Sequence, residues 1–200
     1  MKKINTLLVA GMLLVASAAN AQKWNKDISF LKGQKDLNVQ YSFDKMAVGN
    51  AGLEADYVSS KKAEYNKKEA GKGDKFETSW KAAPVNIYEP RFESLLNKVI
   101  NEAGLTASQN LKSAKYTLMV HITFLEPGFN VGVMKKPAYC DYEFSLVETA
   151  SPSTVLSSAI LKNIPGSQFG GFDFDASARI AECYGKAGKM TGKSILKVIK

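Results

Sequence analysis

Two runs of alternating apolar and polar residues, within residues 115–147, constrain this chain more than any other feature. In the first run every second residue is aromatic or branched, and these side chains are Tyr116, Leu118, Val120, Ile122 and Phe124. Because strand side chains alternate between faces, the pattern predicts a strand with one core face. The other face, which carries Met119 and His121, is mixed, so it is either half covered or a docking surface.

The segment Glu126–Asn130 separates the two runs and has the chemistry of a turn, with the fixed φ of Pro127 beside Gly128. We therefore predict a β-hairpin whose second arm runs from Val131 to Glu148. Pro137 has no N–H for the ladder, which predicts a bulge or an edge there.

An apolar and basic stretch precedes Pro137 and is the preferred interaction site, formed by Val133, Met134, Lys135 and Lys136. Such a tip suits a partner protein or an anionic envelope surface. In the alternative interpretation the valines belong to the core and the lysines are only solvated.

The first 21 residues predict a secretory signal peptide, because Lys2 and Lys3 precede an apolar run that ends in small residues near Ala21. Residues 22–200 then form a single exported domain, periplasmic or secreted. No other apolar run approaches the roughly 20 residues of a membrane span, so we expect no transmembrane anchor. Without Lys2 and Lys3 the chain has 25 basic and 19 acidic residues, a net charge of +6.

The other segments alternate between strand and helix patterns, at 37–44 (strand), 53–69, 75–82 and 90–103 (helices), 154–162 (strand) and 175–198 (helix). Together with the hairpin they give the order β-α-α-β-β-β-α if the short second helix is counted with its neighbour. This order predicts an α+β fold of two layers, a four-stranded, largely antiparallel sheet with helices packed on one face.

The last helix has three distinct faces. Ile180, Tyr184 and Ile195 lie on the predicted buried side, and a stripe of small residues that includes Gly185 and Gly188 permits close backbone approach. Nearly opposite the buried side lies a lysine ridge, composed of Lys186, Lys189, Lys193 and Lys197. The ridge predicts either a polyanion site or an ordinary basic face that favours the helix C-terminus.

Cys140 and Cys183 are the two cysteines of the chain. In an exported protein they can form one disulfide, and the alternative is that both are reduced and packed as small hydrophobic residues. A metal site is not expected, because two cysteines and one histidine without close spacing make a poor ligand set.

No catalytic set is recognisable. His121 is the only imidazole, and neither its neighbours Met119 and Thr123 nor the nearby strands offer an obvious nucleophile or orienting carboxylate. Asp173 and Asp175 can supply calcium ligands, but they suit helix capping better. The lysine-rich segments lack the interleaved arginine and aromatic residues of a nucleic-acid groove. We therefore expect no enzyme, no cofactor, no metal and no nucleic-acid partner.

The segments Glu126–Met134 and Gly171–Asp175 resemble secreted proteins of unknown function from Bacteroidetes-type bacteria. This resemblance implies no established activity or site. In element order alone the chain also resembles the outer-membrane lipoprotein of lipopolysaccharide assembly and the amino-terminal domain of the Tol-system propeller protein. Both of these are binding and assembly modules.

The sequence thus leaves three hypotheses. The first is a non-enzymatic exported binding or assembly module that uses the open sheet face or the hairpin tip to meet an envelope protein. The second is an envelope polyanion binder that uses the lysine ridge to hold lipopolysaccharide, another anionic glycolipid or an acidic glycan. The third, an enzyme of unidentified chemistry, has the least support because the usual catalytic sets are missing.

Overall fold

The computed structural model of the protein describes residues 22–166 and 176–200. The predicted signal peptide and the two aspartates Asp173 and Asp175 lie outside the described residues. The helices and strands follow in the order β1 (Asp36–Ser42), β2 (Ala47–Val48), α1 (Glu54–Lys68), α2 (Lys72–Ala83), η2 (Pro84–Tyr88), α3 (Glu89–Ile100), β3 (Thr106–Gln109), β4 (Tyr116–Glu126), β5 (Phe129–Asn130), β6 (Lys135–Lys136), β7 (Ala138–Glu148), β8 (Ser151–Gly166) and α4 (Ala176–Ile199). Short 3₁₀ turns, η1 (Ser29–Leu31) and η3 (Asn101–Ala103), precede β1 and follow α3.

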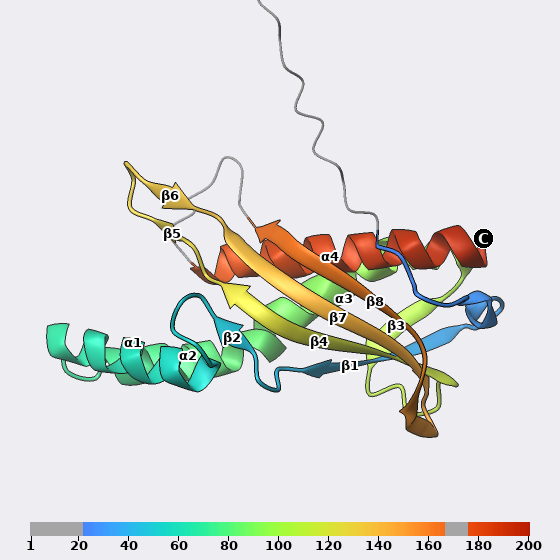
Figure 1. Ribbon diagram of the computed structural model, residues 1–200, viewed down its shortest axis with the longest axis horizontal. Helices are drawn as coiled ribbons and strands as arrows, with labels where there is room; N and C mark the ends of the chain where they lie inside the picture. The colour runs from blue at the N-terminus through green and yellow to red at the C-terminus, as the bar shows by residue number, and fades with distance from the viewer. Residues whose placement is uncertain (1–21, 167–175) are drawn as a thin grey trace, which may run out of the picture.

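The fold is α+β, as the sequence predicts, but its sheet is mixed rather than largely antiparallel (Figure 1). The strand order is β3-β1-β4-β7-β8, and the short β2 adds to the end of β4. β1 runs parallel to both β3 and β4, whereas β4, β7 and β8 form an antiparallel meander. The predicted four-stranded sheet lacked β3, whose four residues bury only Ala107 and carry no alternating pattern.

The helices α3 and α4 cover one face of the sheet, as expected. The predicted buried side of α4 is confirmed, since Ile180, Tyr184 and Ile195 are at most 2% exposed. The glycine stripe has the expected role. A Cβ at Gly188 would lie 2.2 Å from the carbonyl oxygen of Phe92 in α3, so only glycine lets the two helix backbones approach this closely.

The first helices do not cover the sheet but form a helical arm, α1 with α2, that extends beyond it (Figure 1). Tyr57 of α1 joins the two helices through ring contacts with Phe76 and Trp80 of α2, with centroids 6.3 and 4.9 Å apart. Pro84 follows α2 directly, and a proline usually ends or kinks a helix. Instead, the π-helical turn η2, closed by the bond from the Glu89 N–H to the Pro84 carbonyl, carries the helix on into α3.

An irregular amino-terminal segment closes one end of the core. Ile28 and Leu31 are 1% and 0% exposed, which the polar composition of their neighbours did not indicate. The Trp24 indole N–H donates to Ser194 Oγ of α4 at 3.1 Å. Asn25 bonds to the backbone N–H and carbonyl of Ser158 on the outer edge of β8. The segment therefore covers part of an edge strand that would otherwise offer free ladder groups.

The predicted hairpin is confirmed by the antiparallel pairing of β4 with β7, with two changes. A bulge between Ile122 and Phe124 shifts the register, so that Leu125 is buried in place of Phe124. The predicted turn at Glu126–Asn130 is only a bend, and the chain continues into the small β5–β6 hairpin. Its actual turn is closed by the bond from the Val131 N–H to the Met134 carbonyl, at 3.0 Å.

Candidate functional site

The hairpin tip, residues 129–136, protrudes from the end of the sheet (Figure 1). It presents apolar side chains to solvent. Val133 is 93% exposed, and Val131 and Met134 are each 61% exposed. The alternative in which these valines belong to the core is therefore wrong. Contiguous exposed apolar groups on a projecting element are typical of a contact surface.

The base of the tip is held by a carboxylate. One oxygen of Glu126 accepts a hydrogen bond from the Gly128 N–H at 3.0 Å, and the other pairs with Lys136 Nζ at 2.6 Å. Gly128 has φ +63°, and a Cβ there would lie 2.3 Å from the Lys136 carbonyl oxygen, so glycine allows the two arms to cross closely. Lys135 is exposed and has no ion pair within the described part of the chain.

The lysine ridge forms a second surface. Lys189, Lys193 and Lys197 are exposed and Lys186 is partly exposed. None of these four lysines makes an ion pair with any residue of 22–166 or 176–200. The ridge extends over about 16 Å of helix, at 1.5 Å per residue. Its positive charge is therefore not neutralised by the described fold.

Five of the seven lysines of the helical arm behave differently. Ion pairs with arm carboxylates, at 2.6–3.2 Å, are made by Lys61, Lys62, Lys68, Lys72 and Lys81. The hydrogen bonds from Lys61 and Lys68 lower the pKa of Glu64 to about 2, and those from Lys62 and Lys81 lower the pKa of Glu77 to about 2. These lysines are paired within the protein, which favours the ridge over the arm as a site for an external anion.

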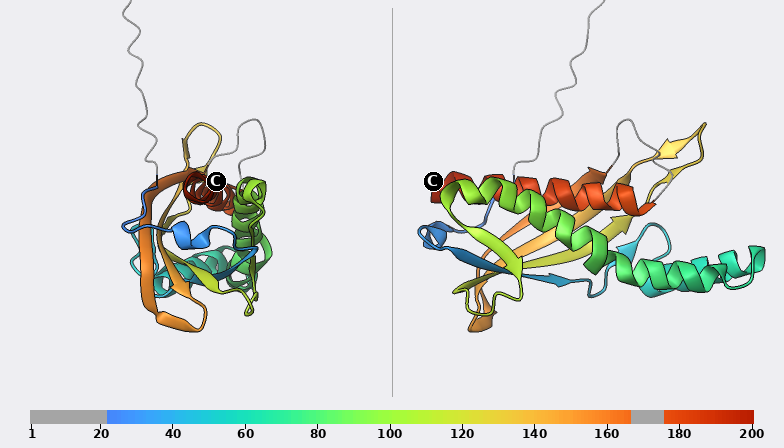
Figure 2. Two further views of the ribbon diagram at one scale, coloured as in Figure 1. Left: turned by 90° about the vertical axis from the view of Figure 1, so that its right-hand side faces the viewer. Right: turned by 180° about the vertical axis from the view of Figure 1, so that it is seen from behind.

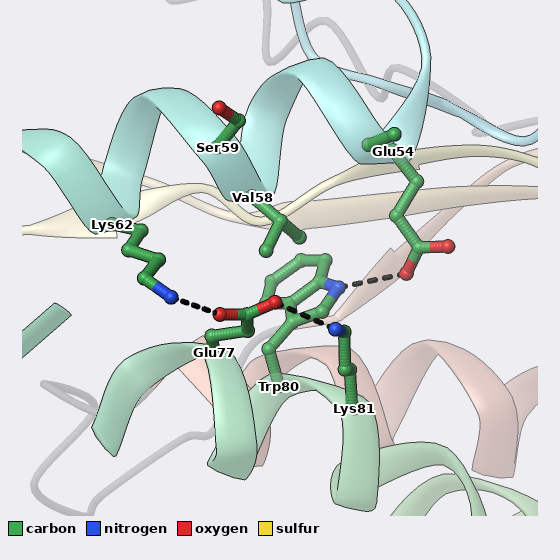
Figure 3. Close-up of a pocket in the computed structure, with 8 residues that line it drawn as sticks. Glu54, Val58, Ser59, Lys62, Glu77, Trp80 and Lys81 are labelled. Atoms are coloured by element: carbon green, nitrogen blue, oxygen red, sulfur yellow. Dashed lines mark hydrogen bonds and ion pairs between the residues drawn. The ribbon is translucent and has the colours of Figure 1, made fainter. Parts of the chain in front are cut away.

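The arm also contains a pocket of about 370 Å³ between α1 and α2 (Figure 3). Val58 and Trp80 form its apolar part, and the Trp80 indole N–H donates to Glu54 at 2.7 Å. On the other side Glu77 bridges Lys62 and Lys81. A ligand would have to break these contacts to use the charged groups, so the pocket supports a binding function less well than the tip.

On the sheet face opposite α3 and α4, Met119 and His121 are partly exposed. The fold places Ser42 Oγ 3.3 Å from His121 Nδ1, and Glu143 directly opposite His121 on β7. The expectation that no nucleophile or carboxylate lies near the histidine is therefore wrong, because these residues meet only through strand pairing. A catalytic triad would need a carboxylate bond to the other ring nitrogen, and none occurs among the residues described.

Cys140 on β7 and Cys183 on α4 are both 0% exposed, and this structure has no bond between their sulfur atoms. Burial and a hydrogen bond with Cys183 raise the pKa of the Cys140 thiol. Gly166, which pairs with Ala138 near Cys140, would place a Cβ only 2.6 Å from Cys183 Sγ. The structure thus brings together the two cysteines that the sequence proposed as a disulfide, and whether they are joined stays a prediction.

Two carboxylates lie close together where α3 packs over β1 and β3. Glu89 is 4% exposed and accepts a hydrogen bond from Gln109 at 2.9 Å, and Glu93 accepts one from the Tyr41 hydroxyl at 3.4 Å. Burial raises the pKa of both carboxyls, and the charge of Glu93 adds to the effect at Glu89. No group of three or more metal-ligating side chains occurs in residues 22–166 and 176–200.

We expect Glu89→Gln to raise the melting temperature at pH 7 and to have little effect near pH 4. A carboxyl whose folded pKa lies above its unfolded value stabilises the fold below the unfolded pKa, and this contribution is lost as pH rises through the folded pKa. Glutamine keeps the acceptor for Gln109 without the charge. Thermal melts of both proteins from pH 4 to 8 test this, with exposed Glu148→Gln as control. An advantage that does not grow with pH would contradict it.

Comparison with known proteins assigns no family. No family model matches the sequence, and no curated protein matches it. Among solved structures, the chain is similar to the PelC dodecamer from Paraburkholderia phytofirmans in space group P6, with a TM-score of 0.41 and 13% identity over 84% of this chain and 96% of that one. A substituted form of the same protein, in space group C2, gives a TM-score of 0.38 at the same identity and coverage. The resemblances drawn from the sequence therefore stay predictions.

Proposed function

We propose that the protein is a non-enzymatic, exported binding or assembly module whose binding element is the hairpin tip. The observation that carries the proposal is the exposure of Val133 at 93%, with Val131 and Met134 beside it. An isolated exposed valine is common, but two exposed valines and an exposed methionine in one projecting turn have no role in the core. The closed base at Glu126 and Lys136 presents them on a fixed support.

The polyanion binder is the second candidate, and a separate observation favours it. The ridge lysines have no ion pair in the described segments, whereas five arm lysines do. Binding to a polyanion through the ridge should weaken steeply as salt rises, because each neutralised lysine releases counterions.

One experiment separates these candidates. A photo-crosslinking residue is placed at Val133, at Lys193 or at Ser153, and the cells that make the protein are irradiated. Ser153 is exposed at the opposite end of the sheet and is the control. We expect a discrete adduct from Val133 that is absent from Ser153. An adduct only at Lys193 that is lost at high salt would favour the polyanion binder, and identical adducts at all three positions would contradict both.

A further inference from the structure

We propose that the hairpin tip and the lysine ridge form one docking surface for an anionic phospholipid membrane. In this arrangement the apolar side chains of the tip enter the interfacial region of the bilayer while the ridge lysines lie against its headgroups. The inference rests on the proposed function, because it uses the same tip, and it names the partner.

The two surfaces lie on the same side of the molecule. In both views of Figure 2 the β5–β6 hairpin rises past α4 on the side away from the helical arm. The buried side of α4, which includes Ile180 and Ile195, faces the sheet and α3. The ridge lies nearly opposite that side. A flat surface that contacts the ridge is therefore positioned to contact the tip as well.

The chemistry of the tip suits a lipid interface. The side chains of Val131, Val133 and Met134 have no polar group that needs a hydrogen-bond partner. Lys135 follows them immediately. Glu126 is the nearest acidic residue in the hairpin, and it is already paired with Lys136. Among the described residues, the charge of the tip and the ridge that is not paired is thus positive throughout, which is complementary to an anionic headgroup layer.

A bilayer can also bind a surface of this shape, in which one element projects beyond another. Interfacial segments bury their apolar side chains about 5–10 Å into the headgroup boundary and need no matching pocket. A protein pocket that binds Val133 would contact the tip alone and would make no contact with the ridge lysines. Joint use of the tip and the ridge therefore distinguishes a membrane from a protein partner.

The test is sedimentation of the purified protein with vesicles of phosphatidylcholine, with and without phosphatidylglycerol. We expect binding only when phosphatidylglycerol is present. Val133→Asp should weaken this binding about tenfold or more. The change removes an apolar side chain that enters the bilayer, and it adds a negative charge that the anionic lipids repel. Replacement of Lys189, Lys193 and Lys197 by glutamine should weaken it about 100-fold, at about fivefold per lysine. Val133 is almost fully exposed, so the aspartate variant should fold, which circular dichroism checks.

The matched control replaces three lysines of the helical arm, Lys67, Lys72 and Lys75, by glutamine, and it should leave binding unchanged. Equal binding to both kinds of vesicle, or equal losses in the ridge and arm variants, would overturn the membrane proposal. Absence of vesicle binding together with a discrete protein adduct at Val133 in cells would also overturn it, while leaving the proposed function in place. Absence of both would contradict the proposed function too.

Discussion

Gly188→Ala should destabilise the protein by about 2–3 kcal/mol, and its melting temperature should fall by about 5–10 °C. Helix propensity alone predicts the opposite sign, because alanine is favoured over an interior glycine by about 1 kcal/mol. Packing should decide, since the new Cβ would lie 2.2 Å from a backbone oxygen of α3, at Phe92. A backbone atom cannot move aside by changing rotamer, so the two helices would have to separate.

Gly185→Ala is the matched control on the same helix. A Cβ there would meet the side chains of Arg91 and Leu95, at 3.1 Å each, and flexible side chains can adjust. We therefore expect this variant to be close to neutral. Urea denaturation of both variants measures the difference, and equal stability of the two would show that the close contact between α3 and α4 at Gly188 is not rigid.

Leu31→Ala should cost about 2–5 kcal/mol, the usual cost of removing a fully buried leucine side chain. This effect would be unusual for a residue in a short 3₁₀ turn before the first strand. Leu31 is 0% exposed, however, and belongs to the same core as the sheet and the covering helices. The measurement is again the free energy of unfolding in urea.

Lys32→Ala, at the next and exposed position, is the control and should change stability by less than about 0.5 kcal/mol. A similarly small effect of Leu31→Ala would mean that the amino-terminal segment is not needed to close the core. The hydrogen bonds of Asn25 to the edge of β8 would then be the main reason for its position.

Sequence periodicity predicted the parts of this fold in which one element has one buried side. The buried side of α4 and the pairing of β4 with β7 follow directly from residues such as Ile180 and Leu118. Periodicity cannot detect an inserted residue, and the bulge before Phe124 therefore exchanged the expected positions of Phe124 and Leu125. It also gave no signal for β3, which pairs with β1 through backbone groups and buries one alanine.

The candidate site was predictable only in its local parts. The tip residues Val133 to Lys136 are neighbours in the sequence, so their composition could be read directly. The row of Ser42, His121 and Glu143 joins three strands that are far apart in the sequence, and nothing in the sequence indicates the register that aligns them. The same applies to Glu89 and Gln109, which meet because α3 returns over β3.

The buried cysteines bear on the order of folding events. Cys140 and Cys183 are enclosed between β7 and α4, so no oxidant of protein size can reach either sulfur once α4 has docked on the sheet. Formation of a disulfide by such an oxidant would therefore have to precede docking of the last helix. Docking that comes first would shield both thiols until the helix detaches. In the presence of a protein oxidant, the redox state of this pair in the folded protein would thus show which of the two steps is faster.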